Sequence, residues 1–195
     1  ITRGSGTYGL AYPEQCIPNL TMFIVPVDRN ALAERREKGV NLITEEDIRW
    51  QHCDINTLNR MPEAMAKQKA FISNAFDALF VRDGKITETT EASFFIYKDG
   101  ILWTHPENNF IHKNITRKLL VERLAPDLQL QVIERAFDKE FALKADEAFI
   151  CGPRCEFMPV VKIDRGFIGD GKLGQIAAAL QNAYKDFVAA ECPAK

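Results

Sequence analysis

The sequence feature that most constrains the fold is a pair of Asp-Gly dipeptides, Asp83-Gly84 and Asp99-Gly100, each flanked by β-forming residues. Such a pair favours a two-residue hairpin turn, because the turn requires positive φ angles that Gly and Asp adopt easily. We therefore predict that residues 76–82 form a strand leading into the first turn. Residues 92–97 and 101–104 are predicted to pair across the second turn.

Helical segments are interspersed with these hairpins. Pro62 suits the first turn of a helix, and residues 115–124 have the apolar spacing of an amphipathic helix. The predicted helices cover residues 29–38, 62–74, 115–124, 138–143 and 172–188, and the further predicted strands cover residues 20–27, 39–44, 128–133, 148–151 and 159–163. Hairpins mixed with helices predict an α+β fold rather than a doubly wound parallel sheet.

Length and composition are those of an ordinary globular protein. With 195 residues, of which 46% are hydrophobic, the chain can bury a large core. A formal net charge of −2 gives it no reason to bind nucleic acid or an anionic membrane, and no apolar run is long enough to span a bilayer. The first residues lack a signal-peptide segment and the five cysteines are scattered, so reduced thiols and a cytoplasmic location are expected.

Two sites suggest binding chemistry from residue type alone. Asn114 and Thr116 stand where a helix starts, so they form either an ordinary N-cap or part of an anion site built from free helix-start N–H groups. Glu88 lies just beyond the first hairpin turn and is either a solvated surface carboxylate or a pocket acid with a cationic partner. Spacing alone leaves both alternatives open.

Other motif classes are not supported. Cys151 and Cys155 enclose a Gly-Pro-Arg turn, but no second Cys/His pair at zinc spacing accompanies them. The three histidines show no metal-ligand spacing, so no metal site is predicted. Nucleophile-elbow, Walker and dinucleotide-binding glycine motifs are also missing, which argues against serine hydrolases, P-loop NTPases and Rossmann enzymes.

Several short sequence motifs nevertheless occur along the chain in an order that resembles that of a known family. They are Arg-Gly-Ser-Gly at residues 3–6, Asp-Ile-Arg-Trp-Gln-His-Cys-Asp-Ile-Asn-Thr-Leu-Asn at 47–59, Ala-Lys-Gln at 66–68, Ile-Thr-Glu at 86–88, Asp-Gly-Ile-Leu-Trp-Thr-His-Pro at 99–106 and Ile-Thr-Arg at 115–117. Together they resemble the class IV, fold-type IV pyridoxal-phosphate enzymes. That family includes D-alanine and other D-amino-acid aminotransferases, branched-chain aminotransferases and 4-amino-4-deoxychorismate lyases.

The resemblance covers nearly the whole chain and implies a domain plan. Residues 1–18 would be an inter-domain segment, and residues 19–195 the larger C-terminal α+β domain with a pseudo-barrel. Nothing in this chain corresponds to the family's small N-terminal domain. The resemblance also implies a homodimer, pyridoxal 5'-phosphate as cofactor and a small amino-acid-like substrate.

Cofactor-binding positions follow from the same resemblance. Glu88 matches the carboxylate that pairs with the pyridine nitrogen, where it keeps the ring protonated and able to accept electrons. Ile115 and Thr116 match the helix-start positions that hold the phosphate. His112 stands where an aliphatic residue usually packs on the ring.

Several positions depart from the family pattern. Gly152, Pro153 and Arg154 replace a hydroxyl-rich phosphate loop, Asn114 replaces a glycine, and Glu91 adds a negative charge to the loop after Glu88. Tyr8 and Leu10 stand where D-amino-acid aminotransferases place Arg and His for the substrate carboxylate, which weakens the case for a D-amino-acid substrate.

The largest departure is Asn56, which occupies the position of the Schiff-base lysine. An amide nitrogen is not a nucleophilic amine, so Asn56 can neither attach the cofactor nor carry the substrate proton. Two interpretations remain. The chain is a pyridoxal-phosphate aminotransferase or lyase that acts on a small amino acid or an amino-chorismate, or it is a catalytically impaired relative that binds a ligand or a partner.

Overall fold

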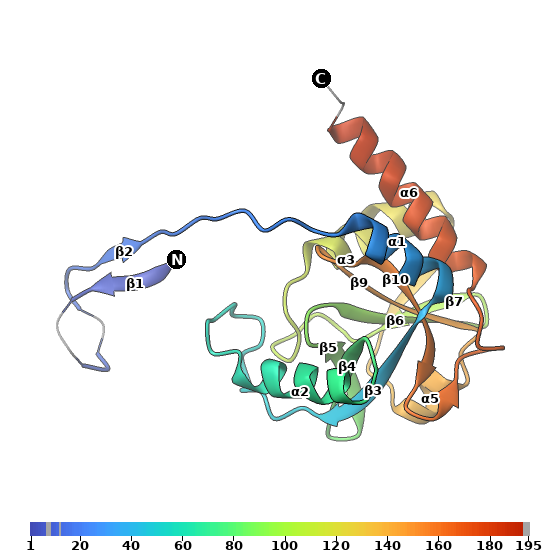
Figure 1. Cartoon of the computed structure of the whole chain (residues 1–195), viewed down its shortest axis with the longest axis horizontal. Helices are drawn as coiled ribbons and strands as arrows, with labels where there is room; N and C mark the ends of the chain where they lie inside the picture. Colours follow the sequence, from blue (N-terminus) through green and yellow to red (C-terminus); the bar gives the residue numbers. More distant parts are fainter. Residues whose placement is uncertain (7–8, 12, 193–195) are drawn as a thin grey trace.

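The computed structural model describes residues 1–6, 9–11 and 13–192 and arranges most of them around a β-sheet that closes on itself (Figure 1). The strands are β1 Thr2–Ser5, β2 Ile17–Asn19, β3 Val40–Glu46, β4 Asp77–Arg82, β5 Lys85–Thr89, β6 Ser93–Lys98, β7 Ile101–Thr104, β8 Gln131–Glu134, β9 Glu147–Gly152, β10 Glu156–Ile163 and β11 Gly166–Phe167. The helices are α1 Arg29–Lys38, α2 Met61–Ile72, α3 Ile115–Leu119, the π-helical η1 Leu120–Leu124, α4 Ala125–Asp127, α5 Lys139–Leu143 and α6 Gln175–Glu191.

The sheet closes because β9 pairs with both β6 and β10. From β10 the order runs through β3, β4 and β5 to β6, and β9 joins β6 back to β10. The β10–β3 and β3–β4 pairs are parallel and the other pairs of this ring are antiparallel. The α+β prediction, with its pseudo-barrel, is therefore confirmed.

The ring is weakest between β5 and β6, where Glu88 opposite Ser93 is the single paired position within the described strands. A turn at residues 90–92 follows Glu88 and Thr89, and its backbone closes through Thr89 N donating to Ala92 O at 2.8 Å. The pairing between β5 and β6 is thus interrupted beyond this one position, and we call this interruption the split in the barrel.

Both Asp-Gly turns form the hairpins that the sequence predicts. Asp83 and Gly84 have φ angles of 49° and 74°, and Asp99 and Gly100 have 53° and 82°. Positive φ at both central positions is the mark of a type I′ turn, whose twist matches that of the strands.

Alternate residues of the barrel strands enter two separate cores. Phe94 and Ile96 of β6 belong to one buried cluster, whereas Phe95 packs with Phe149, Leu120 and other residues under the helices. Side chains on successive strand residues point to opposite faces, so β6 is buried on both. Helices α3, η1 and α6 cover β9 and β10 on the outside of the barrel, as Figure 1 shows.

One predicted strand does not form. Residues 20–27 are extended but have no strand partner in the described ranges, and they join the β1–β2 pair to α1 (Figure 1). Their apolar side chains are exposed, for example Phe23 at 81% and Ile24 at 97%. β-forming residues make a strand only when a neighbouring strand completes the hydrogen bonds, and here none does.

Most other predicted elements form within about three residues of the predicted bounds, whereas β1, β2 and β11 match no predicted strand. The helix predicted at residues 115–124 begins at Ile115 but changes to a π-helix at Leu120. The C-terminal helix begins at Gln175, after Gly174. No helix within the described ranges is long and apolar enough to cross a bilayer.

The stacked ring pair Phe95–Phe149 is a direct test of the outer core. Its ring centroids lie 5.3 Å apart at an interplanar angle of 3°, and both side chains are fully buried. Phe149→Ala should lower the free energy of unfolding by about 3–5 kcal/mol, through lost burial and the cavity left behind. Urea denaturation measures this loss. The exposed Phe23 is the matched control, and Phe23→Ala should change stability by less than about 0.5 kcal/mol.

Candidate functional site

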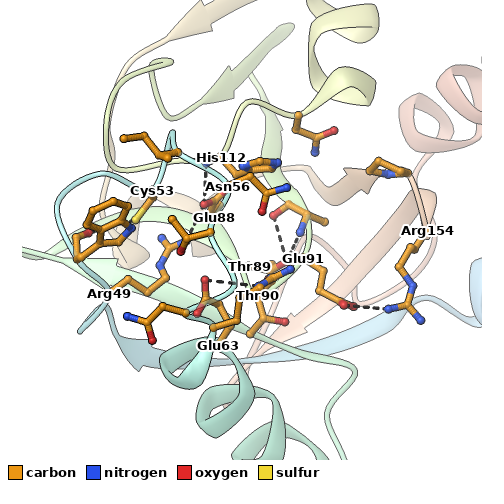
Figure 2. Close-up of a pocket in the computed structure, with 18 residues that line it drawn as sticks. Arg49, Cys53, Asn56, Glu63, Glu88, Thr89, Thr90, Glu91, His112 and Arg154 are labelled. Atoms are coloured by element: carbon orange, nitrogen blue, oxygen red, sulfur yellow. Dashed lines mark hydrogen bonds and ion pairs between the residues drawn. The ribbon is translucent and has the colours of Figure 1, made fainter. Parts of the chain in front are cut away.

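A pocket of about 280 Å³ opens at the split between β5 and β6. Figure 2 shows side chains from five segments around it: the loop after β3, the first turn of α2, the end of β5 with its turn, the loop before α3 and the β9–β10 turn. Of the residues predicted from sequence, the pocket brings together Asn56, Glu88, His112, Pro153 and Arg154.

Glu88 is the buried acid of the pocket, with 4% of its surface exposed. Its Oε1 accepts hydrogen bonds from Arg49 Nη1 at 2.6 Å and from the backbone N of His112 at 2.9 Å. Among the described residues, no donor is bonded to its other oxygen. Burial raises the pKa of Glu88 to about 7, although Arg49 and the His112 amide oppose the rise. The pocket-acid alternative for Glu88 therefore holds.

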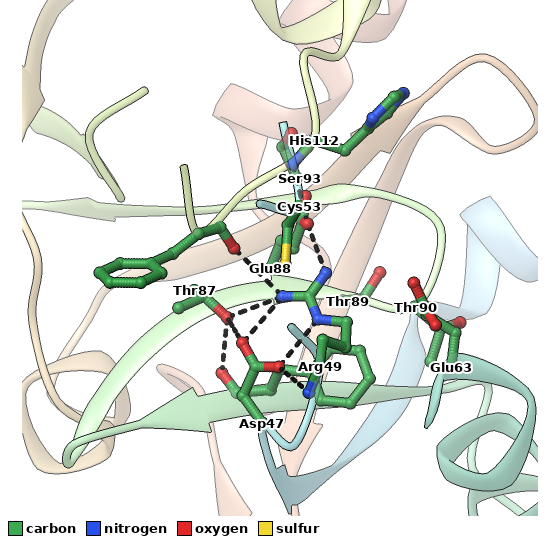
Figure 3. Close-up of polar contacts among 12 residues, drawn as sticks. Asp47, Arg49, Cys53, Glu63, Thr87, Glu88, Thr89, Thr90, Ser93 and His112 are labelled. Atoms are coloured by element: carbon green, nitrogen blue, oxygen red, sulfur yellow. Dashed lines mark hydrogen bonds and ion pairs between the residues drawn. The ribbon is translucent and has the colours of Figure 1, made fainter. Parts of the chain in front are cut away.

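Arg49 connects Glu88 to a second buried carboxylate, Asp47 (Figure 3). Its Nε donates to Asp47 Oδ1 and its Nη2 to Asp47 Oδ2, both at 2.9 Å. Arg82 and the Thr87 hydroxyl bond the same carboxylate, each at 3.2 Å. Burial alone would raise the pKa of Asp47, but the bonds from Arg49 and Arg82 hold it below its ordinary value.

Sequence reasoning quoted Asp47 and Arg49 within a motif but assigned them no role. The sequence did contain a signal for a role in the site. An Asp and an Arg stand two residues apart soon after the strand predicted at residues 39–44, in a segment that also contains Asn56. The Arg49 guanidinium also lies 4.4 Å from the centre of the Phe80 ring, which further fixes its position.

Asn56 lines the pocket in the loop that follows β3. Backbone hydrogen bonds hold this loop, including one from Cys53 N to Asn109 O at 2.8 Å. No lysine is among the pocket-lining residues of the described chain. The side chain at position 56 is thus an amide that faces the same space as Glu88.

The start of α3 is occupied by its own cap. Asn114 Oδ1 accepts from Thr116 N at 2.9 Å and from Arg117 N at 3.4 Å, so the ordinary N-cap alternative is the one observed. Asn114 Nδ2 in turn donates to Ser93 Oγ at 3.1 Å and Cys151 O at 2.7 Å. Ile115 is 73% exposed and Thr116 is buried, and neither is a lining residue within the described part of the chain.

The β9–β10 turn contributes Pro153 and Arg154 to the pocket rim. Arg154 Nη1 lies 3.0 Å from Glu91 Oε1, and this exposed ion pair is seen at the edge of the pocket in Figure 2. Gly152 ends β9, and a Cβ there would lie 3.1 Å from the Glu91 carbonyl oxygen.

The flanking cysteines are buried free thiols. Burial raises the pKa of Cys155 to about 12 and that of Cys151 well above its ordinary value, so neither is a reactive thiolate. Within the described ranges, no group of three or more His, Cys, Asp or Glu side chains is arranged to hold a metal.

Arg60 and Glu63 also line the pocket, and the sequence alone assigned neither of them a role. Arg60 Nη2 donates to Thr90 O at 2.6 Å, and Arg60 Nε lies 3.8 Å from Glu63 Oε1. Of the two predicted substrate positions, only Leu10 lies in the described part of the chain. Leu10 is fully exposed and is not among the described lining residues, and Tyr8 lies outside the residues that the structure describes.

Comparison with known proteins is consistent with this geometry. Residues 1–163 match the family model described as amino-transferase class IV. The chain is 37% identical over 188 residues to a D-alanine aminotransferase of Staphylococcus epidermidis, covering 96% of this chain and 66% of that protein. It is 34% identical over 191 residues to a D-alanine aminotransferase of Bacillus licheniformis, covering 98% of this chain and 66% of that protein. The chain thus spans about two-thirds of the length of these relatives.

Solved structures of similar fold are branched-chain amino acid aminotransferases. The Thermobaculum terrenum enzyme in its pyridoxal-phosphate form matches with a TM-score of 0.73 and 27% identity, over 84% of this chain and 54% of that one. The Escherichia coli enzyme matches with a TM-score of 0.68 and 25% identity, over 77% of this chain and 52% of that one.

The raised pKa of Glu88 makes stability depend on pH. The pKa of Glu88 is about 7 in the folded protein, compared with an ordinary value of 4.5. Between these two pH values the folded protein therefore binds more protons than the unfolded chain does. Stability therefore falls as the pH rises through this window, by on the order of 2–3 kcal/mol. The Glu88→Gln variant has no titratable group at this position. The free energy of unfolding of the variant minus that of the unmodified protein should therefore rise from about pH 5 to about pH 8.

Urea denaturation across this pH range measures the difference. Glu122, which is exposed on η1, provides the matched control. Glu122→Gln should leave the pH dependence unchanged. If the Glu88→Gln and unmodified curves run parallel, Glu88 does not titrate in the predicted window.

Proposed function

Since the chain belongs to the amino-transferase class IV family, we propose that it is the larger-domain portion of a D-alanine aminotransferase-like protein whose pocket holds a pyridine cofactor without a covalent link. The single observation that carries this proposal is the buried Glu88 carboxylate, which lines the pocket and accepts the described hydrogen bonds through Oε1 alone. Asn56 supports the second half of the proposal, because it makes the chain a catalytically impaired member of its family.

Glu88 fits the ring nitrogen of a pyridoxal-type cofactor. A protonated pyridine nitrogen would donate to the other oxygen, and the added positive charge would favour the ionised carboxylate over the protonated one. Arg49 holds Oε1 so that the second oxygen keeps a fixed direction. His112, which also lines the pocket, would pack beside the ring. When bound, pyridoxal phosphate supplies an electron-accepting ring conjugated to the amino group of the substrate.

The residues present do not fit a covalent attachment. Asn56 carries no nucleophilic amine, and no described lining residue is a lysine that replaces it. We therefore assign no catalytic step to the chain.

The substrate class is proposed from the relatives. The curated relatives cited above are D-alanine aminotransferases, which favours an amino acid over an amino-chorismate and aminotransferase ancestry over lyase ancestry. We also propose that residues 1–18 are the inter-domain segment and residues 19–195 the larger domain of the family. Leu10 and Tyr8 give no support to a D-amino-acid carboxylate site, so substrate stereochemistry is not assigned.

Restoring an amine at position 56 tests the function directly. Asn56→Lys mixed with pyridoxal phosphate should give an absorbance band at about 400–430 nm that borohydride removes, because the lysine can attach the cofactor. The unmodified protein should lack this band but bind the cofactor reversibly, measured by quenching of Trp50 fluorescence.

Asn59 also lines the pocket, so Asn59→Lys is the matched control and should give no such band. Surface lysines give the same background absorbance in all three proteins, so a borohydride-sensitive band as strong in the unmodified protein as in Asn56→Lys would contradict the impairment. Absence of binding by both the unmodified and Asn56→Lys proteins would contradict the cofactor pocket itself.

A homodimer is proposed from exposed apolar side chains along one stretch of sequence. The loop before α2 and α2 itself expose Leu58, Met61, Met65, Phe71 and Ile72, each by more than half. Apolar exposure of this extent is typical of an interface.

Light scattering after gel filtration should give the mass of two chains. Met65→Asp should shift the protein toward a single chain, because it places a charge in the apolar contact. Phe167, which is exposed outside this stretch, is the control, and Phe167→Ser should leave the mass unchanged. A single-chain mass for the unmodified protein would contradict the dimer.

A further inference from the structure

The resemblance assigns phosphate binding to the start of α3 and to the β9–β10 turn, yet the described donors there largely have partners within the chain. We infer that Asn114 and Glu91 fill this anion subsite with the chain's own side chains, so that the pocket selects an unphosphorylated pyridine ligand such as pyridoxamine over its 5'-phosphate. This inference rests on the proposed function, because it requires that the ring itself binds beside Glu88.

The helix start is the first filled position. Of the two positions that the resemblance assigns to the phosphate, Ile115 and Thr116, the N–H of Thr116 already donates to Asn114 Oδ1 at 2.9 Å. The next N–H of the helix, that of Arg117, donates to the same oxygen at 3.4 Å. Asn114 cannot rotate away freely, since its Nδ2 is bonded to Ser93 Oγ and Cys151 O and the residue is 8% exposed. Opening the cap would therefore break several buried hydrogen bonds at once.

The β9–β10 turn is the second filled position. Pro153 has no backbone N–H to offer an anion. Arg154 is the cation of this turn, and its guanidinium lies 3.0 Å from the Glu91 carboxylate. A phosphate would have to displace Glu91 from Arg154 and then remain close to the released negative charge, which costs Coulomb energy.

The loop hydroxyls are also committed. Thr89 Oγ1 donates to Ala92 O at 3.0 Å and accepts from Ala92 N at 3.0 Å. Thr90 Oγ1 donates to the buried Asp77 Oδ1 at 2.6 Å. These side chains therefore stabilise the turn after Glu88 and have no hydroxyl hydrogen left for an anion.

The other two arginines of the pocket are engaged as well. Arg49 is bonded to Asp47 and Glu88, and Arg60 to the carbonyl of Thr90 with Glu63 nearby. A phosphate dianion entering the pocket would lose its hydration and meet no unpaired arginine among the described lining residues. A hydroxymethyl group at the same place on the ring has a far smaller desolvation cost, so the ligand without phosphate is favoured.

Pyridoxamine and pyridoxamine 5'-phosphate are the matched probes, because they differ by the phosphate alone and neither carries an aldehyde that reacts with surface lysines. Titration calorimetry on the 195-residue chain should give pyridoxamine the lower dissociation constant, by about threefold or more. Glu91→Gln removes the charge that holds Arg154. It should improve binding of the phosphorylated probe by about tenfold while leaving pyridoxamine unchanged.

Glu91 is an exposed turn residue, so Glu91→Gln is expected to fold, and circular dichroism verifies this. Glu122→Gln is the control for loss of one surface charge and should alter neither constant. If the unmodified chain binds the phosphorylated probe as tightly as pyridoxamine or more tightly, the inference is overturned while the proposed ring site stands. An unchanged preference in Glu91→Gln overturns the role of Glu91. If neither probe binds, the proposed function fails, and this inference fails with it.

Discussion

The candidate site depends on one buried guanidinium. Arg49 lies between two carboxylates, Asp47 and Glu88, that are each less than a tenth exposed. Two such acids in a low-dielectric interior would be strongly destabilising without it, because an unpaired buried charge costs several kcal/mol. Arg49 also joins the loop after β3 to β5 at the point where the barrel ladder is weakest. The same interaction therefore stabilises the fold and orients the acid of the pocket.

A second buried group, Asn114, has a comparable structural role on the other side of the pocket. It caps α3 and bonds both Ser93 at the start of β6 and the carbonyl of Cys151 in β9. The bonds accepted by Asn114 Oδ1 use the N–H groups of Thr116 and Arg117, which a bound anion would otherwise contact. Stability and ligand preference are thus linked, since polar groups that satisfy each other inside the protein are no longer free for a ligand.

The sequence predicted the elements well where the cause is local. The Asp-Gly turns form as expected because their positive φ angles depend on the two turn residues themselves. The strand predicted at residues 20–27 is wrong, since a strand needs a neighbour that propensity cannot supply. Asn56, Glu88 and His112 were found through motif resemblance, and they meet in one pocket. Asp47, Arg49 and Arg60 were not assigned a role from the sequence. The roles of Arg49 and Arg60 depend on partners that lie 30 or more residues away in the chain.

The residue order alone established the hairpins, the α+β class, the family resemblance and the missing amine at position 56, because each depends on residue identity or on neighbours in the chain. Folding decided the rest. The closure of the sheet through β9, the burial that raises the pKa of Glu88, and the commitment of Asn114 and Arg154 to internal partners all join distant segments. Burial and charge pairing are properties of three-dimensional neighbours, so no local pattern in the sequence contains them.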